Sequence, residues 1–467
     1  MVKQIQMKLS ESKTARWSVL ALVAFTMLCG YFITDMMAPL QDLLQTPVMS
    51  GGLGWSGDDY GKFTSAYGWF NVFLLMLIFG GMILDKMGVR FTGLMATGIM
   101  LVGVFIKWFG ISHDFGGETV SIFGTEWGYP LLIASLGYAL FGVGIEIAGI
   151  TVSKIIVKWF KGKEMALAMG LEMAIARIGV AAAVLISPAI ANMGGVKDVS
   201  RSVLFCVILL LIGFIAFCVY FVMDKKLEKQ MGESGEEPEE PFQIKDLGLI
   251  FSSKVFWIVA LLCVLYYSAI FPFQKYAINM LQCNLDFTAE KAGMIFSVFP
   301  LGAAAITPLL GNFLDRKGKG ASMLIYGAFL MIICHLAFAL ALPALKGSIA
   351  GPIVAFTSIV LLGISFSLVP AALWPSVPKL VDNRLLGSAY AVIFWIQNIG
   401  LFAFPMIIGK VLAAVNPGIE DPLQYNYTVP MLIFASLGVF ALFLGLWLKA
   451  EDKKKGYGLE LPNIKKD

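Results

Sequence analysis

Long apolar segments constrain the fold of this chain more than any other feature. A helix that spans a lipid bilayer needs about 20 mostly apolar residues, and the sequence holds about twelve such segments. Only 14% of the residues are charged, against about 25% in soluble domains, so too few charges exist for a water-covered surface. We predict an all-α membrane protein. The expected spans are residues 17–40, 62–84, 91–112, 129–158, 164–191, 202–224, 250–281, 288–314, 320–342, 351–378, 384–414 and 428–449.

Basic residues predict the orientation of these spans, because Lys and Arg accumulate in cytoplasmic connections. They recur in alternate connections, and the remaining connections contain few of them. We therefore expect both termini and the central connection to lie in the cytoplasm. The basic connections contain Lys86 and Arg90, then Lys158, Lys161 and Lys163, then Lys225, Lys226 and Lys229, and finally Arg316, Lys317 and Lys319.

The central connection divides the chain into two parts. Its segment from Gly232 to Pro241 is acidic and has no apolar periodicity, which is typical of a flexible linker. We predict a six-helix bundle over residues 1–224, a cytoplasmic acidic linker over 225–249 and a second six-helix bundle over 250–450. The remaining residues, 451–467, are expected to form a cytoplasmic tail.

Two copies of one motif relate the predicted bundles. The sequence reads GMILDKMG from Gly81 to Gly88, after the second span, and GNFLDRKG from Gly311 to Gly318, after the eighth. Repeats of six spans are typical of transporters that bind their substrate at the repeat interface. A second alignment supports the repeat. It matches Arg177 with Asn398, Lys163 with Arg384 and Glu146 with Ser367.

The duplicated motif resembles the loop motif of the major facilitator superfamily, and this resemblance implies a gating function. Its first glycine would let two helices approach, and its second would permit a tight turn. The carboxylate would cap a helix N-terminus across the interface between the bundles, where the helix dipole favours negative charge. The alternative is that the basic residues only anchor the loops. The candidate gating residues are Gly81, Asp85, Arg90, Asp315 and Arg316.

Ionisable residues inside the spans indicate function, because each costs about 2.5–3.5 kcal/mol to insert at a helix centre. Glu146 in the fourth span and Arg177 in the fifth lie at nearly equal distances from the turn near Gly162. An acid and a base at one depth suit a zwitterion, since arginine offers a planar fork to a carboxylate. The alternative is a structural salt bridge between the two helices.

Other side chains are weaker candidates for the same pocket. Tyr266 and Tyr267 precede an expected kink at Pro272, and Trp374 lies in a proline-rich part of the tenth span. Core packing is the alternative for each of these aromatic residues. Asn398 is a candidate because the repeat matches it with Arg177. Asp35, near the outer end of the first span, is a candidate gate or second cation contact, and Glu172 is expected to face the cytoplasmic vestibule.

The sequence gives no support for an enzyme. Its six cysteines have no paired spacing, and it has only two histidines, so neither a disulfide framework nor a metal site is predicted. No nucleophile–base pair or cofactor motif stands out. We expect no catalytic activity, no metal, no cofactor and no nucleic-acid partner.

With these residues in view, the chain resembles the lysosomal dipeptide transporters of the major facilitator superfamily over nearly its whole length. The resemblance implies uniport of dipeptides by alternating access. It also implies that Glu146 takes the amino terminus, that Arg177 takes the carboxylate and that Trp374 forms part of the pocket. The segments that carry it are FGVGIE up to Glu146, KWFKGKE from Lys158, ARIG around Arg177, YYSAIFPF from Tyr266, ALWP around Trp374 and IQNIG around Asn398.

The chain also departs from that family. Members have glutamine where Glu172 stands, and the glycosylation sequon at Asn426 lies almost at the expected membrane surface. The N-terminal residues carry no acidic dileucine sorting signal. We expect a cytoplasmic membrane, with the lysosomal membrane as the alternative, and an accessory glycoprotein only if the chain is an animal lysosomal member. Two alternatives for function stay open: a facilitator of another small organic anion or solute, and a non-transporting receptor on the same fold.

Overall fold

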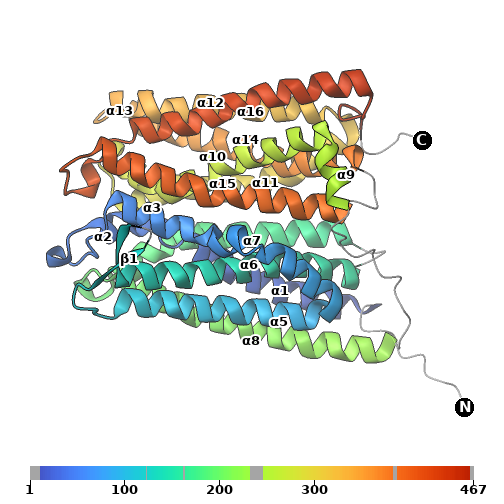
Figure 1. Cartoon of the computed structure of the whole chain (residues 1–467), viewed down its shortest axis with the longest axis horizontal. Helices are drawn as coiled ribbons and strands as arrows, with labels where there is room; N and C mark the ends of the chain where they lie inside the picture. Colours follow the sequence, from blue (N-terminus) through green and yellow to red (C-terminus); the bar gives the residue numbers. More distant parts are fainter. Residues whose placement is uncertain (1–10, 123, 161–163, 232–245, 382–385, 463–467) are drawn as a thin grey trace, which may run out of the picture.

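The computed structural model describes residues 11–122, 124–160, 164–231, 246–381 and 386–462. Long helices lie side by side along the long axis of the molecule (Figure 1). One antiparallel hairpin, β1 (Thr119–Ile122) and β2 (Thr125–Gly128), pairs Thr119 with Gly128. It lies at one end of the molecule, and the first and last described residues lie at the other (Figure 1). We call these the hairpin end and the terminus end.

The first half of the chain forms one group of helices. The predicted match of Lys163 with Arg384, and most of the predicted acidic linker, lie outside the described residues. The elements of this half are α1 (Lys13–Asp35), η2 (Ala38–Leu40), α2 (Gln41–Gln45), η3 (Val48–Ser50), α3 (Gly57–Ser65), η4 (Ala66–Gly68), α4 (Trp69–Phe73), α5 (Met76–Ser112), α6 (Tyr129–Phe160), α7 (Met165–Ala191), η5 (Met193–Gly195) and α8 (Val199–Met231).

The second half repeats this arrangement of long helices (Figure 1). Its short π-helical segment η6 continues α12 towards the hairpin end. The elements of this half are α9 (Asp246–Ser252), α10 (Lys254–Leu285), α11 (Ala289–Lys317), α12 (Gly320–Leu336), η6 (Ala337–Ala341), α13 (Leu342–Ala344), α14 (Ala350–Leu380), α15 (Leu386–Val415), η8 (Pro422–Gln424) and α16 (Thr428–Lys455).

Lipid accounts for the apolar surface of these helices. In the described part of the chain, 11 helices are long and apolar enough to cross a membrane. The most apolar of them, α8, has a mean hydropathy of 3.1 over its central window, yet only 33% of that window is buried in the protein. Side chains such as Ile208 and Ile215 are half exposed, which is stable only where hydrocarbon covers them.

The second predicted span, 62–84, is not one helix, which corrects the sequence prediction. It is built from α3, η4, α4 and the first part of α5. The helical conformation is interrupted at Leu75, whose φ is 52°. No glycine or proline marks this point in the sequence. The break is stabilised from the other half, because the indole Nε1 of Trp395 donates to the Val72 carbonyl (3.1 Å), one of the carbonyls that a helix end leaves unpaired.

Two helix pairs form the main interface between the halves: α3 packs on α15, and α7 packs on α11. The closest approach of the two halves, between α3 and α15, is possible because both helices have a glycine there. A Cβ atom on Gly61 would lie 2.7 Å from the Gly409 Cα, and a Cβ on Gly409 would lie 2.6 Å from the Gly61 Cα. Neither position therefore accepts a side chain, and the two helix backbones are in direct contact near the hairpin end.

Candidate functional site

Glu146 lies on α6 and receives a hydrogen bond from the first half. The Tyr67 hydroxyl donates to its Oε1 at 2.7 Å. Tyr67 belongs to η4, inside the broken second span, and its ring lies 5.7 Å from that of Tyr138 on α6. The sequence analysis did not find Tyr67, because η4 carries no charge or motif that marks it. One acceptor oxygen of Glu146 is thus fixed in position, and the side chain is partly exposed.

Arg177 lies on α7 and faces aromatic rings of the other half. Its guanidinium carbon is 4.9 Å from the ring centroid of Phe366 on α14 and 6.0 Å from that of Phe271 on α10. Cation–π contacts of this kind attract a guanidinium by about 0.5–2 kcal/mol and leave its in-plane N–H donors unused. Arg177 is therefore held at the interface between the halves, with donors available for an anionic group.

The two charges lie at similar depth without pairing. Glu146 lies 14 residues before the end of α6 (160 − 146), and Arg177 lies 12 residues after the start of α7 (177 − 165). At about 1.5 Å per residue, both lie near the middle of the bundle. Among the residues that the structure describes, no ion pair within 4.0 Å joins them. The structural salt bridge is thus absent from this conformation.

Trp374 and Tyr267 form one aromatic cluster beside Arg177. The Trp374 indole Nε1 donates to the Tyr267 hydroxyl at 3.3 Å, and its ring stacks on Phe394 at 4.8 Å. Tyr267 stacks in turn on Phe271 at 5.2 Å, the ring that Arg177 contacts. Rings of α10 and α14 therefore pack on the guanidinium, and Phe394 of α15 extends the cluster through Trp374. Such flat apolar faces accept a peptide plane or an apolar side chain.

The structure places the other two pocket candidates differently. Tyr266 is fully buried and its hydroxyl donates to the Leu324 carbonyl of α12, so it packs inside the second half and is not part of the aromatic cluster. Asn398 is also buried, and its Nδ2 donates to the Phe394 carbonyl of its own helix. Its Oδ1 has no partner among the described residues. Asn398 stands where α15 meets Gly68 of η4.

A buried ion pair crosses the interface towards the hairpin end. Lys275 Nζ on α10 lies 2.7 Å from Asp35 Oδ1 on α1 and also donates to the Thr34 carbonyl (2.6 Å). Asp35 was a candidate gate, and this contact makes it part of the closure between the halves. Lys275 was missed, although a lysine inside the seventh span is the same signal that identified Glu146 and Arg177.

A polar stripe on α10 extends this closure. Asn279, one turn beyond Lys275, accepts from the Tyr427 hydroxyl (2.6 Å), which in turn accepts from Gln41 Nε2 (2.9 Å). One turn further, Gln282 Nε2 donates to Asp42 Oδ2 (3.2 Å). The hydrogen bonds between described residues of the two halves lie at mid-depth or nearer the hairpin end. We conclude that the halves are closed on each other at this end.

The gating motif of the first half lies at the terminus end. Asp85 pairs with Lys154 of α6 at 2.8 Å, which is a contact within its own half and not the predicted helix cap across the interface. A Cβ on Gly81 would meet nothing within 4 Å, so the expected close helix contact is absent in this conformation. Gly88, with φ +74°, makes the predicted tight turn. Open space around Gly81 agrees with halves whose described contacts lie at mid-depth or nearer the hairpin end.

The buried carboxylate of Asp224, which was not predicted from the sequence, joins three helices at the terminus end of the first half. Asp224 on α8 is fully buried and accepts from Lys158 Nζ and from Trp159 Nε1, both at 2.8 Å. Arg90 lies 3.8 Å from it and also binds Glu228. Asp224 therefore links α5, α6 and α8, and Arg90 serves to hold the first half together.

The motif of the second half has similar geometry. Gly318 has φ +73° and makes the same turn as Gly88, and a Cβ on Gly311 would meet nothing within 4 Å. Arg316 is exposed, and Asp315 lies near enough to Lys379 of α14 to interact electrostatically. The described residues contain no group of three or more His, Cys, Asp or Glu side chains arranged to hold a metal ion.

This fold, with unpaired charges at the interface of two similar halves, is that of a membrane transporter. Residues 20–405 match the family model of the Major Facilitator Superfamily. The chain belongs to this superfamily, as the sequence analysis predicted. Its family and relatives are transporters rather than enzymes.

Among characterised proteins, the chain is similar to the lysosomal dipeptide transporter MFSD1 of several animals. It is 27% identical to that of Bos taurus over 412 residues, which cover 85% of this chain and 79% of that protein. It is 27% identical to that of Homo sapiens over 410 residues, covering 85% and 80%. With that of Danio rerio the identity is 28% over 355 residues, covering 74% and 70%.

Solved structures show the same fold. A mutant of the nucleoside transporter NupG has a TM-score of 0.68 at 15% identity, covering 92% of this chain and 99% of that one. A bacterial homologue of the human lysosomal transporter Spinster also has a TM-score of 0.68, at 14% identity, covering 95% and 98%. A mutant of the peptide transporter POT has a TM-score of 0.64 at 14% identity, covering 93% and 94%.

Proposed function

We propose that this transporter carries dipeptides by alternating access and works as a uniporter. Arg177 binds the carboxylate of the peptide, Glu146 binds its amino group, and Trp374 and Tyr267 contact the part between them. The observation that supports this most is the free guanidinium of Arg177, held on the rings of Phe271 and Phe366 at the depth of Glu146. The names of the similar animal transporters agree with this substrate class.

We further propose that the terminus end faces the cytoplasm and that the conformation described here is open to it. The basic connections lie at this end, as expected for cytoplasmic loops. The closure at the hairpin end, built on Asp35 and Lys275, would then be the outer gate. Asp85 and Asp315, with their neighbours Gly81, Arg90 and Arg316, would govern the inner gate. Each half would rock as one body.

Blocked dipeptides test the assignment of the two termini. Arg177→Ala should weaken binding of a dipeptide with a free carboxylate by about 10- to 150-fold, since a hydrogen bond to a charged group contributes about 1.5–3 kcal/mol. The same variant should bind a C-terminally amidated dipeptide almost as wild type does. Glu146→Gln should show the reverse pattern with N-acetylated dipeptides. The readout is a binding titration on purified protein.

The structure makes these variants informative. Arg177 forms no ion pair within 4.0 Å among the described residues and interacts only electrostatically with Glu172 on its own helix, so its removal breaks no close ion pair. Glu146→Gln keeps an oxygen that accepts from Tyr67. Both variants should therefore fold. Equal losses for free and blocked peptides would overturn the assignment.

A second candidate function is transport of a small organic anion. It is favoured by a difference between the two charges: among the described residues Arg177 has no hydrogen bond or ion pair within 4.0 Å and packs on aromatic rings, whereas Glu146 already accepts a hydrogen bond from Tyr67. Thermal-shift measurements with dipeptides and with monocarboxylates lacking an amino group distinguish the two. Stabilisation by monocarboxylates that survives Glu146→Gln would favour the anion carrier.

We propose a cytoplasmic membrane as the location, with the lysosomal membrane as the alternative. The helical bundles would extend over residues 1–224 and 250–450, with the acidic linker between them. An accessory glycoprotein is proposed only for a lysosomal setting. Fractionation of cells that express the tagged chain, followed by detection in each membrane, tests the location.

A further inference from the structure

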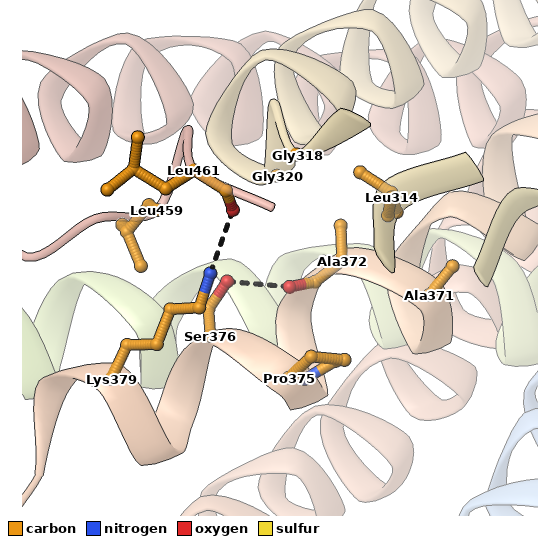
Figure 2. Close-up of a pocket in the computed structure, with 10 residues that line it drawn as sticks. All are labelled: Leu314, Gly318, Gly320, Ala371, Ala372, Pro375, Ser376, Lys379, Leu459 and Leu461. Carbon is orange, nitrogen blue, oxygen red and sulfur yellow. Dashed lines mark hydrogen bonds between the residues drawn. The ribbon is translucent and has the colours of Figure 1, made fainter. Parts of the chain in front are cut away.

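The last described residues, 456–462, fold back onto the terminus end of the second half. Helix α16 stops at Gly456, whose φ is +72°. The chain then turns, so that Leu459 becomes 2% exposed. Figure 2 shows Leu459 and Leu461 across a small pocket from Leu314 of α11 and Pro375 of α14. We call residues 456–462 the C-terminal strap.

The strap pairs the free backbone N–H groups at the start of α12. Lys319 N donates to the Glu460 carbonyl (3.0 Å), and Gly320 N donates to the Leu459 carbonyl (2.9 Å). The Glu460 carboxylate accepts from Ser322 N and from Ser322 Oγ, both at 2.8 Å. These are the donors that a helix N-terminus leaves unpaired, and a carboxylate there also suits the helix dipole.

The strap also lies between a lysine and an aspartate of two other helices. Lys379 Nζ, near the end of α14, donates to the carbonyls of Gly458 (3.0 Å) and Leu461 (3.2 Å), the latter drawn in Figure 2. On the other side, Leu459 N donates to Asp452 Oδ1 of α16 (3.1 Å). One short segment thus joins α12, α14 and α16.

The internal repeat allows the strap contacts to be compared with the matching region of the first half. The register that matches Glu146 with Ser367 also matches Lys158 with Lys379, and Asp452 lies near the end of α16 as Asp224 lies near the end of α8. In the first half, Lys158 binds Asp224 directly. In the second half, the strap backbone lies between the matched lysine, Lys379, and Asp452.

The second half has a glycine where the first half has Arg90. Matching Gly88 with Gly318 places Gly320 at the position of Arg90. The Arg90 side chain reaches Asp224, whereas Gly320 has no side chain, and a Cβ there would lie 3.0 Å from the Leu459 carbonyl oxygen. The strap fills the space that an arginine would need.

We propose that the C-terminal strap replaces the missing arginine cluster of the second half and acts as a releasable clasp. While docked, it makes α12, α14 and α16 move as one body, as the Asp224 cluster does for α5, α6 and α8. The first cluster is built from side chains within helices. The second depends on one seven-residue segment that lies outside the helices, so it can be undone by anything that binds or modifies that segment.

The part of α14 that the strap holds has little rigidity of its own. Pro370, Pro375 and Pro378 each remove a helical hydrogen bond within this segment. Trp374 of the proposed pocket lies between the first two of these prolines. Lys379 and Ser376 line the strap pocket directly (Figure 2). Release of the strap therefore frees the segment that carries Trp374.

Truncation tests the clasp. Removing residues 457–467 should increase hydrogen–deuterium exchange in 319–324 and 374–381 at least fivefold, with exchange in 86–92 unchanged. Dipeptide turnover should fall at least fivefold while ligand-induced thermal stabilisation is kept. Truncation after Pro462, which keeps the strap, is the matched control and should behave as the full chain. Glu460→Ala, which keeps every helix, should show the same pattern more weakly.

The internal repeat suggests a second substitution that should restore function to the truncated chain. In the truncated chain, Gly320→Arg should restore protection of 374–381 and most of the turnover, because it recreates the position of Arg90 beside Asp452. Gly320→Ala in the same chain is the control and should restore neither. Unchanged exchange in 374–381 after truncation, or an arginine no better than alanine, would overturn the proposal. The exchange measurements need no substrate, so they remain decisive if dipeptides are not the cargo.

Discussion

The ion pair between Lys275 and Asp35 allows a direct test of how the hairpin end is closed. Lys275→Met removes the ammonium and keeps a side chain of similar length. Asp35 is 3% exposed and would then be buried without its cation. The Thr34 carbonyl would still accept a hydrogen bond from the Tyr138 hydroxyl at 2.9 Å. The group left without a partner for its charge is therefore the Asp35 carboxylate.

The burial of Asp35 determines how much Lys275→Met destabilises the closed arrangement. Removing one partner of a buried ion pair costs about 3–5 kcal/mol, because the remaining charge is uncompensated. The cost applies to the closed arrangement only, since opening would give Asp35 access to water. At about 1.4 kcal/mol per factor of ten, the closed-to-open ratio should fall by more than a hundredfold.

Pulsed electron–electron spin distances measure this ratio. Spin labels at Asp58→Cys on α3 and Lys410→Cys on α15 report the separation of the two halves at the hairpin end. Cys218 is the native cysteine that is not fully buried, so Cys218→Ser provides the background. The parent should give mainly the short distance, and Lys275→Met should add a longer one.

Two controls decide whether the pair itself is responsible. Lys107 is also fully buried, but its Nζ has no hydrogen-bond partner among the described residues and lies 5.2 Å from the Tyr138 ring centroid. Lys107→Met should therefore leave the distances unchanged. The double variant Asp35→Asn with Lys275→Met should recover most of the short distance. If Lys275→Met keeps the parental distances, the ion pair does not hold the gate.

Three further predictions concern the pocket, the gating motif and the first half. Tyr67→Phe should weaken binding of dipeptides with a free amino group by about tenfold, within the value of one charge-assisted hydrogen bond, and calorimetry should show no such loss for N-acetylated peptides. Asp85→Asn should slow turnover in proteoliposomes but keep ligand-induced stabilisation, and Asp315→Asn should do so more mildly; normal turnover would exclude a gating function. Asp224→Asn should lower thermal stability by about 3–5 kcal/mol, whereas Glu228→Gln, at an exposed pair worth at most about 1 kcal/mol, should change the melting temperature little.

Much of this protein was predictable from local sequence. The apolar segments predicted where most of the long helices lie, because the length needed to cross hydrocarbon is a property of each segment alone. The ends were less predictable: α8 continues to Met231, and α5 joins the end of the second predicted span to the third. The turns at Gly88 and Gly318 followed from the duplicated motif. The common depth of Glu146 and Arg177 followed from counting residues along two helices joined by a short turn.

Tertiary structure decided which side chains meet. Neighbouring residues on a helix point about 100° apart, so the sequence did not distinguish Tyr267, which joins the aromatic cluster, from Tyr266, which packs against α12. The break at Leu75 depends on an indole from the other half. The Lys275–Asp35 pair joins helices far apart in the chain, and the strap binds α12 only because α16 returns to the same end. Such contacts depend on how the helices pack, and a residue pattern within one segment carries no information about a partner in another.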